Sequence, residues 1–208
     1  MRPERISLES VRDNDSLVKL AARIRDGAVF VYPTETIYGI GGVIEDEVEG
    51  RILAAKKRGP DKHMILVAGS RDSFASLGLE FDKHLQALAD AFWPGNLTIV
   101  VPSKVLGRDV GVRVSAHPFL TALAEHLHQP VYSTSANLSG QPYVNDTDTI
   151  FARFAESIDF MIDAGPLPPS QPSTVVGPSP ESGVALLREG AIPASEIYQV
   201  AGKATLSE

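Results

Sequence analysis

The chain has 208 residues, 43% of them hydrophobic, which is enough for one well-packed domain. Its 19 Lys and Arg against 26 Asp and Glu give a formal net charge of −7, which argues against a protein that binds nucleic acid through overall positive charge. The absence of cysteine excludes disulfides, thiolate catalysis and cysteine-ligated metals.

The N-terminal half alternates helices with short apolar strands. Residues 1–14 are polar, so they predict an extended lead-in and no signal peptide. In chain order, the elements expected next are a helix capped by Asp15 or Ser16 and ended by Gly27, a strand over 28–33, a helix over 46–57, a strand over 64–68 and a helix over 82–92.

The C-terminal half continues this alternation. Its expected elements are strands over 97–102 and 110–115, a helix over 118–127, a strand over 130–134, a helix over 146–157, a strand over 158–163, a Pro/Ser/Gly-rich loop over 165–183 with a short strand at 174–176, and a strand over 184–190. The first two strands are too close for a helical crossover, so we expect them to be antiparallel.

The pattern predicts an α/β fold, a twisted mixed sheet flanked by helices in one domain over 15–190. Residues 191–208 are expected to form a C-terminal tail. No apolar run reaches the ~20 residues of a membrane helix, so we expect a cytoplasmic protein with no membrane contact.

The segment YPTETIYGIGG (32–42) follows a predicted strand. Hydroxyl groups such as those of Thr34 and Thr36, just beyond a strand end, can orient a small polar ligand. The same residues also fit a simple turn, because Pro33 stops the strand and the glycines permit positive φ. The spacing matches neither a Walker loop nor a dinucleotide fingerprint.

The segment KKRGPDKH (56–63) reverses the sign of charge in an acidic protein. Cations at the end of the preceding helix would complement its dipole, but one or two suffice for that purpose. Lys56 and Arg58 therefore also fit a polyphosphate clamp, and a patch that contacts RNA backbone is a third possibility.

The segment YSTSANLSGQP (132–142) places small polar side chains directly after a predicted buried strand. Ser133, Thr134, Ser135 and Asn137 can bind phosphate or carboxylate oxygens without adding charge, or they can cap a helix or turn. Three weaker candidates are Arg113, inside a strand of valines, and Ser173 and Arg188, each of which is more often structural when seen alone.

Together these segments resemble the YrdC-like family of L-threonylcarbamoyladenylate synthases over residues 15–190. The matching segments are YPTETIYGIGG, KKRGPDKHMILV, FWPGNLTIVVP, VGVRVSAHP, PVYSTSANLSGQP and PSTVVG with LLREG. The chain looks like the short, single-domain form of this family. His63-Met64 stands where some members have Pro-Leu, which leaves the fine amino-acid preference open.

The resemblance implies a reaction and its substrates. L-threonine and bicarbonate would give an N-carboxylated threonine that attacks the α-phosphate of ATP, accompanied by Mg²⁺. Pyrophosphate would leave, and a downstream tRNA threonylcarbamoyl transferase would pass the threonylcarbamoyl group to adenosine 37 of tRNA. The loop over 165–183 is a candidate lid that would shield the carbamate from water.

The resemblance also implies roles for ten residues. The residues that would bind ATP are the K-x-R pair, the S-x-N pair and two further positions: Lys56, Arg58, Ser135, Asn137, Tyr143 and Arg188. Lys56 and Arg58, the two cations of K-x-R, would also be catalytic. The threonine site would consist of Thr34, Arg113, Ser133 and Ser173.

Two other functions compete with this interpretation. An RNA-binding module could use the basic residues from Lys56 to Lys62, with a weak tRNA or double-stranded RNA contact, but the net charge and the lack of an aromatic platform count against it. A carbamoyl-transferring domain of the kind found in hydrogenase-maturation proteins ranks last, because the cysteine-rich zinc-binding segments of those proteins are missing.

Overall fold

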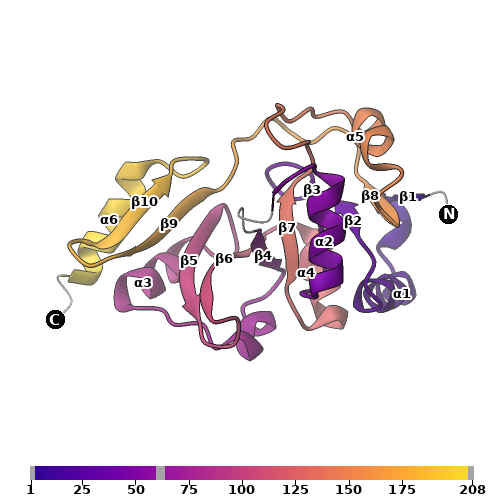
Figure 1. The fold of residues 1–208 in the computed structure, drawn as a ribbon. Coiled ribbons are helices and arrows are strands. Elements are labelled where there is room, and N and C mark those ends of the chain that lie inside the picture. Colours follow the sequence, from indigo (N-terminus) through magenta and orange to yellow (C-terminus); the bar gives the residue numbers. More distant parts are fainter. Residues whose placement is uncertain (1–2, 60–63, 206–208) are drawn as a thin grey trace.

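A computed structural model describes residues 3–59 and 64–205 (Figure 1). Ten strands form one mixed sheet in the order β1-β8-β2-β3-β7-β4-β6-β5-β9-β10. Helices flank the sheet, with α1 packed on α4 near one end and α3 packed on α6 near the other. The α/β prediction of a mixed sheet flanked by helices is therefore confirmed.

The strands are short, as expected for a largely buried sheet. Their bounds are β1 Glu4–Ser7, β2 Phe30–Tyr32, β3 Gly39–Gly42, β4 Ile65–Ala68, β5 Leu97–Ser103, β6 Arg108–Val114, β7 Val131–Ser135, β8 Phe160–Asp163, β9 Thr174–Ser179 and β10 Gly183–Arg188. β5 and β6 pair antiparallel, which confirms the prediction made from their spacing.

The α-helices are α1 Asn14–Arg25, α2 Asp46–Ala55, α3 Lys83–Phe92, α4 Pro118–Leu127, α5 Thr147–Phe154 and α6 Ala194–Thr205, and two 3-10 helices cover Leu8–Val11 and Asp72–Leu77. The cap of α1 is Asp13, not Asp15 or Ser16, because the Asp13 side chain accepts from the backbone N–H of Ser16 at 3.0 Å. Within the described residues, no helix has the length and apolar character needed to cross a bilayer.

Both ends of the chain take part in the fold. The predicted lead-in contains β1, which pairs parallel with β8 at one edge of the sheet. The segment predicted as a tail contains α6, whose Ile197 and Ala201 are buried. These two residues are four apart on one face of the helix, a spacing that explains why α6 packs against α3 instead of lying loose.

The glycines of the segment 32–42, which also fit a simple turn, form the strand β3. Glycine is disfavoured in strands unless another group comes close to the backbone, and two such approaches occur here. A Cβ on Gly41 would clash with the carbonyl oxygen of Tyr132, and a Cβ on Gly39 would lie 3.2 Å from both Ser133 Oγ and the Tyr32 ring. The glycines therefore allow β3 to fit between β2 and β7.

Residues 164–173, which we call the strap, connect β8 with β9, the second and ninth strands of the sheet (Figure 1). Ten residues reach at most ~36 Å, and seven strand spacings measure ~34 Å in a flat sheet, so the strap has to run extended. Its prolines at 166, 168, 169 and 172 favour that conformation. The strand after it continues to Ser179, beyond the expected 174–176, so only the strap remains of the predicted loop.

Candidate active site

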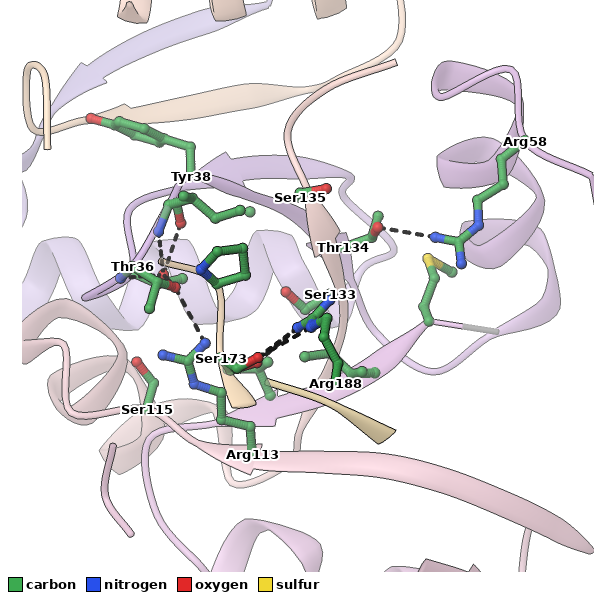
Figure 2. Close-up of a pocket in the computed structure, with 17 residues that line it drawn as sticks. Thr36, Tyr38, Arg58, Arg113, Ser115, Ser133, Thr134, Ser135, Ser173 and Arg188 are labelled. Atoms are coloured by element: carbon green, nitrogen blue, oxygen red, sulfur yellow. Dashed lines mark hydrogen bonds between the residues drawn. The ribbon is translucent and has the colours of Figure 1, made fainter. Parts of the chain in front are cut away.

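A cavity of about 330 Å³ opens above the middle of the sheet, between the strap and the ends of the central strands (Figure 2). Seven of the ten residues predicted for the site line it: Thr34, Arg58, Arg113, Ser133, Ser135, Ser173 and Arg188. The other three, Lys56, Asn137 and Tyr143, lie behind the lining. Among the described residues, the lining includes no Asp, Glu or His.

The sheet register explains why serines and small residues form the floor. Ser133 and Ser135 are two apart on β7, so they share one face of the sheet. On β3 they pair with Gly41 and Gly39, which have no side chains to fill the space. Tyr32 lies beneath, and its hydroxyl donates to Ser133 Oγ at 2.7 Å, which fixes that serine.

Thr34 is largely used by its own loop. Its hydroxyl donates to the Ile37 carbonyl at 2.8 Å and accepts from the backbone N–H groups of Thr36 and Ile37 at 3.1 and 3.2 Å. The Thr36 hydroxyl lies 2.9 Å from it and 3.3 Å from Nη1 of Arg113. Thr36 therefore links the loop to the arginine, while Thr34 holds the loop closed.

Arg113 is a buried arginine with a carboxylate partner. Its Nη2 lies 2.9 Å from Oε1 of Glu35, whose other oxygen accepts from the Ser115 hydroxyl at 2.5 Å. Burial raises the pKa of Glu35, but the charge of Arg113 and the donors of Ser115 and Ala116 outweigh this and lower the pKa below its ordinary value. Glu35 is thus ionised and neutralises Arg113.

Two further guanidinium groups reach the cavity from the other side (Figure 2). Arg58 Nη1 donates to Thr134 Oγ1 at 3.1 Å, and Arg188 Nη2 donates to the Ser173 carbonyl at 2.8 Å. Burial lowers the pKa of both arginines, and the charge of Arg113 lowers that of Arg188 further. The Ser173 hydroxyl also lies 2.8 Å from Thr98 Oγ1, which anchors the end of the strap.

Lys56 does not line the cavity and is only 3% exposed. Its ammonium donates to the carbonyl oxygens of Ser135 and Asn137, the latter at 2.7 Å. Burial, together with the charge of Arg58, lowers the pKa of Lys56 to about 8. Lys56 thus joins the end of α2 to the loop that follows β7.

The remaining two predicted residues support the lining from behind. The Asn137 side chain accepts from the Ser135 hydroxyl and donates to the Gln141 carbonyl at 2.6 Å, so it shapes the loop after β7. The Tyr143 hydroxyl accepts from the backbone N–H of Tyr38 at 3.1 Å. Both residues therefore determine where lining residues lie.

Sequence reasoning gave no role to several residues that the fold brings to the site. Ser115 and Pro172 line the cavity, and Glu35 lies beside Arg113. A signal for Glu35 existed, since a buried arginine on a strand of valines requires an acidic partner. The sequence could not say which of the 26 acidic residues supplies it.

The described part of the basic segment, residues 56–59, does not form one exposed basic patch. Lys56 is buried, Arg58 lines the cavity and Lys57 is exposed. Lys62 and His63 lie outside the described residues, so of the His63-Met64 pair only Met64 is described. Met64 itself is buried and lines the cavity. Of the described cations 56–58, only Lys57 is presented outward, as an RNA-binding face would require.

The donor groups do not form a metal site. In the part of the chain that the structure describes, no group of three His, Asp or Glu side chains could hold a metal ion. Both oxygens of Glu35, the carboxylate behind the cavity, already accept hydrogen bonds from protein groups. The described residues therefore do not offer the ligands of a resident Mg²⁺ ion.

Comparison with known proteins shows which protein family the chain belongs to. The Sua5_yciO_yrdC family model, described as "Telomere recombination", matches residues 22–190. The threonylcarbamoyl-AMP synthase of Pyrococcus abyssi is 34% identical over 196 residues, which cover 89% of this chain and 57% of that protein. The threonylcarbamoyl-AMP synthase of Chromohalobacter salexigens is 31% identical over 170 residues, which cover 77% of this chain and 91% of that protein.

A solved structure agrees with these matches. The crystal structure of P. abyssi Sua5 complexed with L-threonine superposes with a TM-score of 0.84 at 30% identity, covering 97% of this chain and 61% of that chain. The chain thus spans less than two thirds of the length of the P. abyssi protein.

Proposed function

Because this chain belongs to the Sua5–YciO–YrdC family, we propose that it is an L-threonylcarbamoyladenylate synthase. The enzyme would convert L-threonine, bicarbonate and ATP into threonylcarbamoyl-AMP and pyrophosphate. One observation carries the proposal: three guanidinium groups converge on a hydroxyl-lined cavity whose described lining has no Asp, Glu or His. Such a cavity suits anionic substrates and a reaction that needs no side-chain base.

The distribution of charge gives the substrates an orientation. Arg113 is neutralised by Glu35, so its end of the cavity suits the small amino acid. Arg58 and Arg188 contribute positive charge on the opposite side and suit the triphosphate. The solved structure of the P. abyssi relative is a complex with L-threonine, which supports threonine as the amino acid.

The chemistry follows from the charge of the nucleophile. The neutral amino group of threonine forms a bond to the carbon of bicarbonate, and the loss of one water molecule gives a carbamate. One carbamate oxygen then forms a bond to the α-phosphorus of ATP. The bond from that phosphorus to the bridging oxygen breaks, and the electron pair leaves with pyrophosphate. The carbamate is already an anion, so the protein supplies charge neutralisation and alignment and does not remove a proton in this step.

The threonine site consists of Thr34, Arg113, Ser133 and Ser173 in this proposal. The Arg113 guanidinium binds the carboxylate, and the serine hydroxyls accept or donate around the carbamate. Thr34 acts mainly by keeping its loop closed, because four polar contacts already involve its hydroxyl.

The nucleotide site has two kinds of residue. Arg58, Ser135 and Arg188 contact the phosphates directly. Lys56, Asn137 and Tyr143 act from behind: the first two hold the loop after β7, and Tyr143 holds Tyr38 in the wall of the cavity. Lys56 is therefore assigned to positioning that loop, and the direct catalytic charge to Arg58.

The remaining participants follow from the same reaction. Mg²⁺ would enter with the triphosphate, bound to its oxygens and to water, because the protein offers no cluster of ligands in its described part. The product would be consumed in the cytoplasm by a tRNA threonylcarbamoyl transferase that modifies adenosine 37. Residues 15–190 would form the catalytic domain.

Pyrophosphate release tests the proposal. The purified protein is incubated with ATP, Mg²⁺ and bicarbonate, and with threonine, serine or no amino acid. We expect release that requires both threonine and bicarbonate. If no condition gives release from a folded protein that still binds RNA, the proposal is wrong and the binding-module hypothesis takes its place.

A further inference from the structure

The structure contains a carboxylate at the site that the reaction does not itself require. We propose that Glu35 is a positioning residue for amino-acid binding, which acts by fixing the guanidinium of Arg113 so that a single nitrogen faces the substrate. This inference rests on the proposed function, because it assigns the threonine carboxylate to Arg113.

Arg113 is held by acceptors on three sides. Its Nε donates to the Gly95 carbonyl at 2.9 Å. Its Nη2 donates to Asn96 Oδ1 at 2.9 Å and faces Glu35 Oε1 at the same distance. The proton of Nε and one proton of Nη2 are thereby used, the Glu35 carboxylate holds Nη2 by its charge, and the planar group cannot turn without breaking these contacts.

Nη1 is the nitrogen that the described residues hold least tightly. It donates to the Thr36 hydroxyl at 3.3 Å, which is the longest of the three hydrogen bonds that the guanidinium makes to the described residues. The side chain of Arg113 is 6% exposed, so a ligand can reach it only from the cavity. A substrate carboxylate would therefore bind to a nitrogen whose direction the protein has already fixed, which limits the entropy lost on binding.

Glu35 is itself held in place and is not a gate that the substrate displaces. Its Oε1 also accepts from the backbone N–H of Ala116 at 2.9 Å, and its Oε2 accepts from the Ser115 hydroxyl at 2.5 Å. Its lowered pKa keeps it ionised at neutral pH. An ionised carboxylate with these donors is a weak base and a stable partner for Arg113.

The test compares Glu35→Gln with a matched control, Asp159→Asn. Asp159 makes the same kind of contacts away from the cavity: its carboxylate accepts from Arg51 at 2.8 Å and from the backbone N–H of Val29 at 2.7 Å. Both variants lose a carboxylate–arginine pair, so a general structural effect appears in both. Calorimetry then measures the affinity of each folded protein for L-threonine and, separately, for ATP with Mg²⁺.

We expect Glu35→Gln to bind threonine about tenfold or more weakly, the scale of a misplaced charged hydrogen bond, while its ATP affinity stays the same or rises. Asp159→Asn should bind both ligands as the wild type does. Glu35→Asp keeps the charge on a shorter side chain, so its threonine affinity should be intermediate; it also serves as the test variant if Glu35→Gln does not fold.

Three results would overturn the inference. They are threonine affinity unchanged or increased in Glu35→Gln, equal weakening of threonine and ATP binding, and equal weakening in the Asp159→Asn control. A wild-type protein that binds no threonine would instead remove the proposed function itself, so the two failures are distinguishable.

Discussion

Replacing Lys56 by methionine tests the role that the structure gives to this buried ammonium. Lys56→Met keeps the length of the side chain but removes the donors to the Ser135 and Asn137 carbonyls. Hydrogen bonds to a charged group are worth ~1.5–3 kcal/mol each, so the gross loss is roughly 3–6 kcal/mol.

Part of that loss is offset, because the variant no longer has to bury the charged ammonium of Lys56. Burial lowers the pKa of Lys56 from 10.5 to about 8, which corresponds to roughly 3 kcal/mol against the charged form. The variant should therefore lose a net ~0–3 kcal/mol of unfolding free energy and remain folded. Its turnover should fall strongly, because the loop with Ser135 and Asn137 loses its tether to α2.

The effect on stability should also depend on pH. Between the folded pKa of about 8 and the unfolded value of 10.5, the unfolded chain binds the Lys56 proton and the folded chain does not. The unfolding free energy of the wild type therefore rises with pH in that window, by ~2 kcal/mol between pH 8 and 10. Lys56→Met should lack this rise, so the difference between the two proteins grows.

Urea unfolding followed by the fluorescence of Trp93, the single tryptophan, measures both quantities. Measurements stop at pH 10, because the raised pKa of buried tyrosines such as Tyr38 lowers stability at higher pH. A difference that stays constant from pH 8 to 10, or a variant more stable than the wild type at pH 7, would refute the assignment of a desolvated, hydrogen-bonded ammonium.

Other parts of the structure give further predictions. Arg58→Met should keep the fold and weaken ATP binding about 10- to 150-fold, measured by calorimetry, and an unchanged affinity would remove Arg58 from the phosphate site. Gly41→Ala should cost ~3 kcal/mol or more, because the new Cβ meets the Tyr132 carbonyl; a melting temperature equal to that of the wild type would contradict this packing. Asn145→Ala removes two hydrogen bonds to the backbone of Leu167 in the strap, at 2.6 and 3.0 Å, so hydrogen exchange of the Leu167 amide should accelerate, whereas unchanged exchange would mean that the strap is held elsewhere.

Most of the sheet could be predicted from the sequence, because its strands are apolar runs bounded by turn residues. β3 could not, since its four residues are three glycines and Ile40, and the need for glycine arises from Tyr32 and Tyr132 on neighbouring strands. β1 was also hidden: its exposed, polar residues carry no apolar pattern, and its strand conformation comes from pairing with β8.

The candidate site was predicted in composition but not in geometry. Three arginines that the motif positions singled out, Arg58, Arg113 and Arg188, line one cavity. The direction of Lys56 could not be inferred, because it depends on carbonyl groups about 80 residues further along the chain. The partner of Arg113 likewise becomes visible only when the sheet brings Glu35 beside it.

The most direct test of the proposed activity is the fate of the bicarbonate carbon. The protein is incubated with ATP, Mg²⁺, L-threonine and isotopically labelled bicarbonate, and the adenylate product is analysed by mass spectrometry. We expect an adenylate that contains threonine and carries the label, and that disappears in Arg58→Met. A folded protein that releases pyrophosphate without incorporating the label, or that forms an unlabelled threonyl adenylate, would contradict the proposed reaction.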